Sequence, residues 1–178
     1  MSLKSGNISL RAIEPSDINI LFSWENDTQY WVLSNTMAPY SKHVLNKYLD
    51  NAHLDIYEAK QLRMVIEVDG IKPIGLLDLF EFDPFHMRAG VGILIADNNE
   101  QGKGYATEAL KILIDYSFAH LQLKQLFCNI TTDNEISIKL FEKVGFTCVG
   151  TKKSWLKTYE GWKDENLYQL INTKFEIE

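Results

Sequence analysis

The stretch EQGKGYATEALKILIDYSF, Glu100 to Phe118, begins with two closely spaced glycines and continues with the apolar spacing of an amphipathic helix. The first N–H groups of a helix have no partner inside it, and the helix dipole adds partial positive charge at that end. Glycine permits positive φ angles and a close approach of the backbone to a ligand. The residues Gln101–Ala106 therefore predict either a tight turn alone or a cradle of N–H groups for a phosphate or pyrophosphate.

The sequence around this turn favours anion binding. It lacks the G-x-x-x-x-G-K-[ST] pattern of a P-loop, and Thr107 stands where G-x-G-x-x-G needs its third glycine. The apolar run Arg88–Ala96, which we expect to be a central strand, comes before the turn. A second strand and helix follow, and that helix begins at Asn134 and is closed by Gly145. The turn therefore lies in the first of two consecutive strand–helix units.

Hydrophobic periodicity and turn residues predict the rest of the chain. Asp69–Gly70 joins two strands as a hairpin, and Glu160–Gly161 joins the last two. Residues Thr28–Tyr40 are aromatic and irregular. We expect an α+β fold, a mixed sheet with helices on its faces, and not a doubly wound fold. The expected strands are 8–13, 62–68, 73–82, 88–96, 123–131, 147–156 and 164–175, and the expected helices lie within 14–27, 41–52, 100–118 and 134–146.

Composition limits the classes of protein and partner. No linker or repeat divides the 178 residues, so we expect a single domain, residues 1–178. The net charge of −6 argues against a nucleic-acid partner and is compatible with a cationic or amine substrate. No apolar run of membrane-spanning length occurs, and the start MSLKSGN does not resemble a signal peptide. We therefore expect a cytoplasmic protein.

The cysteines and histidines predict neither a disulfide nor a metal site. Cys128 and Cys148 lie in apolar, strand-like runs without C-x-x-C spacing, so we expect two buried free thiols. The four histidines are spread over unrelated segments, and no two have the i, i+4 spacing of a helical metal site.

Two blocks of the sequence resemble a known enzyme family. Gln101-x-x-Gly104-x-Ala106 matches the Gln/Arg-x-x-Gly-x-Gly/Ala signature of the GCN5-related N-acetyltransferases, the GNAT superfamily. The pattern N-x-x-S-x-x-x-F-E-K-V-G-F, Asn134 to Phe146, matches the next block of that family. The resemblance covers nearly the whole chain. It implies the GNAT fold, in the order β-α-α-β-β-β-α-β-α-β-β, with a central mixed sheet that is splayed open between two parallel strands.

Within the superfamily, the chain is most similar to the spermidine/spermine N-acetyltransferases, through the acidic and aromatic end of strand 73–82 and the step His86–Ala89. The ribosomal-protein N-acetyltransferases are the second match. The resemblance implies direct attack of a primary amine on acetyl-CoA in a ternary complex, with a polyamine such as spermidine as the first acceptor. A protein α-amino group or another small amine is the alternative acceptor, and a non-catalytic acyl-CoA-binding protein is a further alternative. Relatives often form dimers or larger rings, so a homo-oligomer is also an open expectation.

The resemblance also implies a site for the cofactor, acetyl-CoA. The cleft would lie between the strands Gly92–Ala96 and Leu126–Thr131, and the amides of residues 102–106 would hold the pyrophosphate. Main-chain groups of residues 93–95 would pair with the pantetheine arm and polarise the acetyl carbonyl, and Asn134 would bind near the reactive end. The expected cofactor-binding residues are Ile93, Leu94, Ile95, Gln101, Gly102, Lys103, Gly104, Tyr105, Ala106, Thr107, Asn134 and Phe141.

The reaction needs a base for the amine and an acid for the leaving thiolate. Asp78, Glu81 and Asp83 are the candidates for a base, or for carboxylates that hold a water. Strand alternation puts Glu81 and Asp83 on one face and Asp78 on the other. Many family members place a tyrosine acid where this chain has Phe141, and some ribosomal-protein N-acetyltransferases use a serine that corresponds to Ser137. We therefore expect Ser137, Glu81 and Asp83 to be catalytic.

The acceptor site is expected to combine aromatic and acidic residues. Tyr30 and Trp31 lie in the irregular segment before the second helix, where substrate-binding loops are common. Their rings could bind an ammonium group by cation–π contact or pack against the core, and the sequence leaves both open. The expected substrate-binding residues are these two aromatic residues together with Asp78, Glu81 and Asp83.

Overall fold

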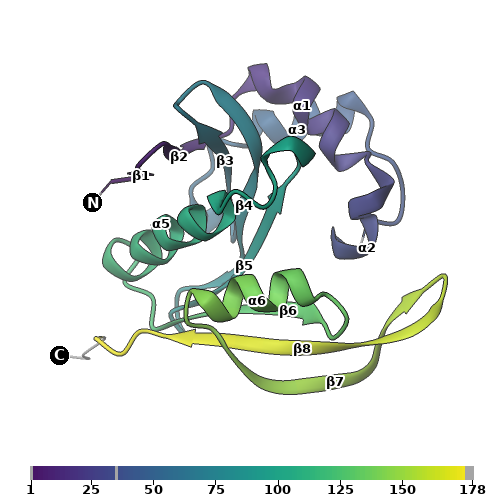
Figure 1. The fold of residues 1–178 in the computed structure, drawn as a ribbon. Coiled ribbons are helices and arrows are strands. Elements are labelled where there is room, and N and C mark those ends of the chain that lie inside the picture. Colours follow the sequence, from purple (N-terminus) through teal and green to yellow (C-terminus); the bar gives the residue numbers. More distant parts are fainter. Residues whose placement is uncertain (1, 35, 175–178) are drawn as a thin grey trace.

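A mixed eight-stranded sheet organises the chain (Figure 1). The computed structural model describes residues 2–34 and 36–174. Neighbouring strands follow the order β1-β2-β3-β4-β5-β6-β8-β7, and all neighbours are antiparallel except the parallel pair β5 and β6. The strands are β1 (Lys4–Ser5), β2 (Ile8–Ala12), β3 (Leu62–Val68), β4 (Lys72–Asp83), β5 (Arg88–Ile95), β6 (Gln125–Thr131), β7 (Thr147–Thr158) and β8 (Gly161–Ile171).

Helices cover both faces of the sheet, and polar residues mark where they begin. Ser41 caps α3, because its hydroxyl accepts a hydrogen bond from the N–H of Val44 at 3.2 Å.

In the described part of the chain, no helix is long and apolar enough to cross a membrane. The α-helices are α1 (Ile18–Glu25), α2 (Trp31–Ser34), α3 (Lys42–Asp50), α4 (Ile56–Ala59), α5 (Tyr105–Ala119) and α6 (Glu135–Lys143).

The alternation of side chains in β3 divides the core into two layers. Met64 and Ile66 pack in the layer that includes Leu110 of α5. Val65, which lies between them in the sequence, packs in the other layer with Leu21 of α1. All five side chains are almost fully buried. The sheet is therefore held between α5 on one face and α1 and α3 on the other (Figure 1), and this support fixes the positions of β4 and β5.

The parallel strands β5 and β6 separate after a short stretch of pairing. Pairing begins at Arg88 with Gln125 and ends at Gly90 with Phe127. Beyond this point β5 continues along β4 as far as Ile95, whereas β6 continues along β8. The sheet is therefore open between the second halves of β5 and β6. This opening confirms the splayed, mixed sheet that the resemblance implies.

The elements differ from the prediction mainly at their ends. The two-residue strand β1 and the short helices α2 and α4 are additional to the predicted order. The first predicted helix starts as a 3-10 turn, Pro15–Asp17, and the segment expected to be irregular contains another, Thr28–Tyr30, before α2. β7 continues past the predicted end at Leu156 to Thr158, and β8 begins at Gly161, before the predicted start at Asp164, and ends at Ile171; the two strands form a hairpin that extends past the body of the sheet (Figure 1). The last residue predicted for the final strand, Phe175, lies outside the described residues.

The two cysteines are both free, but the prediction that both are buried is wrong. Cys128 on β6 is buried, and burial raises the pKa of its thiol to about 12. Cys148 is exposed because it lies on β7, the edge strand of the sheet, most of whose side chains face solvent. An apolar strand pattern does not reveal whether a strand lies at the edge.

Candidate active site

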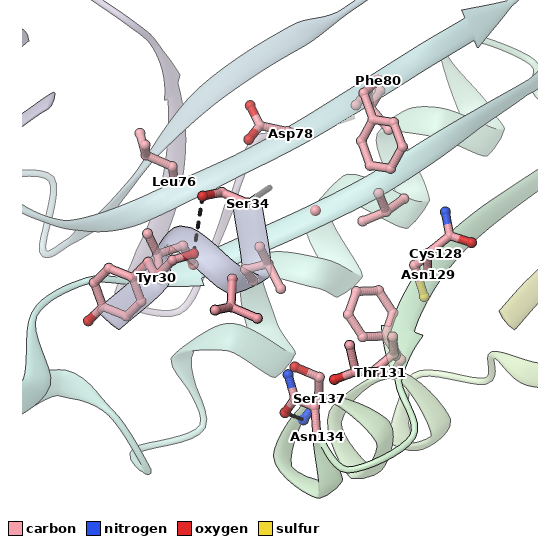
Figure 2. A pocket seen from close by; sticks show the side chains of 18 of the residues that line it. Tyr30, Ser34, Leu76, Asp78, Phe80, Cys128, Asn129, Thr131, Asn134 and Ser137 are labelled. Atoms are coloured by element: carbon pink, nitrogen blue, oxygen red, sulfur yellow. Dashed lines mark hydrogen bonds between the residues drawn. The ribbon is translucent and has the colours of Figure 1, made fainter. Parts of the chain in front are cut away.

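A cavity of about 430 Å³ lies where β5 and β6 separate. Gly92, Ile93 and Leu94 of β5 line one side, and residues 128–131 of β6 line the other. Side chains from α1, α2, α6, β3, β4 and the β7–β8 hairpin complete the walls. Figure 2 shows Ser34 of α2, Asp78 of β4 and Ser137 of α6 among them. The cavity therefore arises from the topology of the sheet, and it brings together residues that are far apart in the sequence.

The glycine turn before α5 has the geometry that anion binding requires. Gly102 and Gly104 have φ angles of 75° and 87°, which side-chain-bearing residues rarely adopt. A Cβ atom at either position would meet no atom within 4 Å, so the turn borders open space. Among the described residues, the amides of residues 102–106 have no hydrogen-bond acceptor, and α5 begins directly behind them. Unpaired N–H groups, an open approach and the helix dipole together favour a phosphate group.

The side chains next to the glycines hold the turn in place. Gln101 donates from Nε2 to the carbonyl oxygen of Ile95 at 2.9 Å, which ties the turn to the end of β5. Lys103 forms an ion pair with Glu100 at 2.8 Å, and Thr107 is buried in the first turn of α5. The cavity lining includes neither Ile95 nor residues 101–107. The turn therefore lies beyond the cavity, on the side toward which β5 leads.

The start of α6 supplies polar groups to the cavity. Asn134 caps the helix, and its Oδ1 accepts a hydrogen bond from the N–H of Ser137 at 3.1 Å. The hydroxyl of Ser137 has no hydrogen-bond partner within the described residues, and Figure 2 shows it beside Asn134 at the cavity wall. Phe141 also lines the cavity, with its ring 5.1 Å from that of Phe146 in edge-to-face contact. Of these three residues, only Asn134 and Ser137 have side chains that can form hydrogen bonds with a ligand.

The three predicted carboxylates lie in two different cavities. Asp78 lines the cavity between β5 and β6, whereas Glu81 and Asp83 line a separate cavity of about 360 Å³. A bulge between Phe80 and Asp83, where Glu81 has a φ angle of 47°, interrupts the pairing of β4. The N–H of His86 donates to Asp83 at 2.9 Å and holds the pKa of that carboxyl below its ordinary value. The structure does not bring Glu81 and Asp83 to the start of α6, so their catalytic role stays a prediction.

The sequence did not single out three charged residues of the cavity, Glu25, Arg63 and Glu165. Arg63 lies opposite Asp78 in the register of β3 and β4 and donates to both of its carboxylate oxygens, at 2.6 Å from Nε and 3.0 Å from Nη2. Its Nη1 donates to Oε1 of Glu25, and its guanidinium lies 5.7 Å from the ring centroid of Tyr48. Burial lowers the pKa of Arg63, but the two carboxylates outweigh burial, so the pKa stays above its ordinary value.

The two predicted aromatic residues have different surroundings. Tyr30 lines the cavity, and its hydroxyl donates to the carbonyl oxygen of Ala96 at 3.4 Å. Burial raises the pKa of this tyrosine. Trp31 does not line the cavity; its Nε1 donates to the backbone carbonyl of Glu25 at 3.0 Å. Trp31 therefore holds the end of α1, which agrees with the packing alternative, while Tyr30 remains a candidate for contact with a substrate.

Comparison with known proteins places this site in context. Residues 7–147 match the family model "Acetyltransferase (GNAT) domain". The chain is 33% identical over 147 residues to spermidine N(1)-acetyltransferase of Escherichia coli (strain K12), an alignment that covers 81% of this chain and 75% of that protein. It is 30% identical over 145 residues to spermidine N(1)-acetyltransferase of Vibrio cholerae, with 80% of each chain covered.

A solved structure supports the same fold. The crystal structure of spermidine N-acetyltransferase from Vibrio cholerae in complex with CoA and spermine superimposes with a TM-score of 0.87 at 24% identity, covering 96% of this chain and 99% of that one. The family model spans well over half of the chain, and the splayed strands and the glycine turn agree with it. The chain therefore belongs to the GNAT acetyltransferase family and is an acetyl-CoA-dependent N-acetyltransferase.

Proposed function

We propose that the protein acetylates a primary amine of a polyamine such as spermidine, by direct attack of the amine on acetyl-CoA in a ternary complex. The observation that carries the proposal is the cavity between β5 and β6. Asn134 and Ser137 supply polar groups at one wall. At another wall, two carboxylates, Glu25 and Asp78, share the single positive charge of Arg63. Carboxylates in a cleft attract and orient cationic ligands. Two relatives at 30% identity or above are named spermidine N(1)-acetyltransferases.

The chain offers a set of groups for holding the cofactor, whose thioester supplies the activated acetyl group. The amides of residues 102–106 would hold the pyrophosphate. Ile93 lies on the part of β5 that has no strand partner on the β6 side. Consecutive residues of a strand direct their main-chain groups to opposite sides, and the carbonyl of Leu94 faces Gly75 of β4. The main-chain groups of Ile93 therefore face the opening, where they would pair with an extended ligand arm and stabilise a developing oxyanion. Asn134 uses Oδ1 to cap α6 and retains its amide group for a contact near the reactive end.

We propose Ser137 as the proton donor to the leaving thiolate. Its hydroxyl lies in the cavity lining, whereas the phenyl ring of Phe141 has no proton to give. Asp78 is the predicted carboxylate that shares this cavity. Because both of its oxygens accept hydrogen bonds from Arg63, it is a poor direct base, and the proton of the amine would leave through water.

A thiol-release assay tests the function. The protein is mixed with acetyl-CoA and, in separate reactions, with spermidine, a peptide with an N-terminal serine or alanine, and an aminoglycoside. We expect the fastest release of free thiol with spermidine. Faster release with the peptide would replace the polyamine by a protein α-amino group as the acceptor, and binding of acetyl-CoA without thiol release for any amine would contradict the proposal.

Assembly and location are part of the same proposal. A dodecameric structure of spermidine N-acetyltransferase from Vibrio cholerae has a TM-score of 0.80 to this chain at 28% identity. We propose that this chain also associates with copies of itself and that it acts in the cytoplasm. Sedimentation velocity would detect the assembly, and a single species of monomer mass would contradict it.

A further inference from the structure

The charges that line the cavity do not balance, and the excess lies at one place. Glu25, Arg63, Asp78 and Glu165 are its charged lining residues in the part of the chain that the structure describes. Glu165 has its own counterion, because Lys152 forms an ion pair with it. Glu25 and Asp78 instead share the single cation of Arg63. One negative charge of this group of three therefore has no counterion.

The hydrogen bonds locate the free acceptor on Glu25. Arg63 occupies both carboxylate oxygens of Asp78. It occupies only Oε1 of Glu25, and within residues 2–34 and 36–174 Oε2 has no donor. An ionised carboxylate accepts several hydrogen bonds, and an oxygen without a donor is ready to accept one from a ligand.

Glu25 is also held firmly. It is the last residue of α1, and the indole of Trp31 binds its backbone carbonyl at 3.0 Å. Arg63 holds its side chain and is itself packed on the ring of Tyr48. The side chain of Glu25 is only 15% exposed, so its charge is poorly screened by water. A carboxylate that is fixed in this way loses little entropy when it binds a cation.

We propose that Glu25 binds the ammonium group of the acceptor that does not react, and that Arg63 is the positioning residue that orients it; this inference rests on the proposed function. Glu25 does not suit the reacting nitrogen, because that nitrogen must be neutral and a carboxylate beside it would stabilise its charged form. The second nitrogen of a polyamine stays protonated, and its N–H groups match the free oxygen of Glu25. In Figure 2, Asp78, which shares Arg63 with Glu25, lies on the far side of the cavity from Asn134 and Ser137.

Two acceptors of equal length isolate this contact. 1,5-Diaminopentane and pentylamine differ only in the second nitrogen, so the ratio of their kcat/KM values measures what that nitrogen contributes. We expect wild type to prefer the diamine and Glu25→Gln to reduce the ratio by about tenfold or more, as a charged hydrogen bond predicts. The loss should lie in the KM of the diamine, while kcat/KM for pentylamine changes less than about twofold. Glu25→Asp, which keeps the charge on a shorter side chain, should retain part of the preference.

Glu165→Gln is the matched control, because it removes a carboxylate of the same cavity that already has a counterion. Its ratio should equal that of wild type, and the affinity of each variant for coenzyme A reports whether the fold is intact. A wild type that prefers the diamine and a folded Glu25→Gln variant with the same preference would overturn this inference alone. A wild type that shows no preference for the diamine would also overturn this inference alone, whereas a wild type that acetylates neither these two amines nor spermidine would overturn the proposed function and this inference with it.

Discussion

Ser137 and Phe141 lie on the same helix, and the difference between a free hydroxyl and a phenyl ring decides how the thiolate can be protonated. Sequence patterns alone were sufficient to place Asn134, Ser137 and Phe141 together, because the spacing of a helix fixes their relative positions. They could not find Glu25 or its link to Arg63. That contact joins the end of a helix to a strand far along the chain, so it exists only after tertiary packing.

The first prediction concerns Ser137. Ser137→Ala should lower kcat for spermidine by about tenfold or more at saturating acetyl-CoA, because general acid catalysis contributes about 10²-fold or more. KM for spermidine should change little, since the hydroxyl acts in the transition state. Ser34→Ala, another serine of the cavity lining, is the control and should retain kcat. Steady-state kinetics on the purified variants decide the matter, and an unchanged kcat in Ser137→Ala removes this residue from the mechanism.

A companion prediction concerns Phe141. If the missing acid limits the Ser137→Ala enzyme, the double variant Ser137→Ala, Phe141→Tyr should recover part of the lost kcat, because a phenol at this lining position carries a proton. The measurement is kcat for both variants at the same pH. A double variant no faster than Ser137→Ala would show that a proton donor on α6 is not what the reaction lacks.

At the scale of elements, the register of β3 and β4 shows what a pattern can and cannot predict. The Asp69–Gly70 turn predicts the hairpin, but a shift between Ile66 and Glu67 changes which residues lie opposite each other. The pairing of Arg63 with Asp78 depends on that shift. Helix α5 is similarly predictable from its spacing, whereas the open side of its glycine turn required the surrounding structure.

The glycine turn yields a prediction at the scale of elements. Gly104→Ala should raise KM for acetyl-CoA by about tenfold, because a left-handed φ of 87° strains an alanine by roughly 1–2 kcal/mol and shifts the amides that precede α5. KM for the amine should be nearly unchanged. Gly70→Ala is the matched control, since Gly70 also has a positive φ, 67°, and open space around it, but lies in the β3–β4 turn. An equal rise in both variants would mean that strain, and not cofactor binding, explains the effect.

Asp17 joins the start of α1 to the sheet and makes stability depend on pH. Arg11 donates to both of its oxygens, at 2.7 and 2.8 Å. Burial raises the pKa of Asp17, but Arg11 and the N–H of Glu14 lower it further, so the pKa lies below 3.8. Because the pKa is lowered by folding, this group stabilises the fold fully above the ordinary pKa, and the contribution disappears as pH falls through the lowered value.

Asp17→Asn should therefore reduce the free energy of unfolding by about 2 kcal/mol near neutral pH, as loss of a buried charged partner predicts. The difference from wild type should shrink well below pH 3.8, where the wild-type carboxyl also becomes neutral. Urea denaturation near neutral pH and well below pH 3.8 measures this difference in the free energy of unfolding. Asp115→Asn, on the exposed face of α5, should leave the free energy of unfolding unchanged at both pH values. A difference between Asp17→Asn and wild type that grows in acid would contradict the pH dependence proposed for Asp17.

At the scale of the whole molecule, the fold class and the order of the main elements could be predicted, because long periodic segments carry strong signals. The opening between β5 and β6 could not be derived from periodicity, since it depends on which neighbours two strands find beyond Gly90 and Phe127. Resemblance to a family supplied that expectation. The division of the carboxylates between two cavities likewise follows from the bulge of β4, which alternation does not predict.

Binding of the cofactor should stabilise the whole fold. Coenzyme A at a hundred times its Kd should add about 2.7 kcal/mol to the free energy of unfolding and raise Tm by a few degrees. Pantetheine, which lacks the diphosphate, should raise Tm much less at the same concentration, because it cannot use the amides that precede α5. Equal shifts from both compounds in a thermal melt would mean that these amides contribute no binding.

The most direct measurement is a crystal structure of the protein with coenzyme A and spermidine. We expect diphosphate oxygens within hydrogen-bond distance of the amides of residues 102–106, and the pantetheine arm between β5 and β6 with its thiol near Asn134 and Ser137. Coenzyme A bound elsewhere, or these amides blocked by side chains in the complex, would contradict the account.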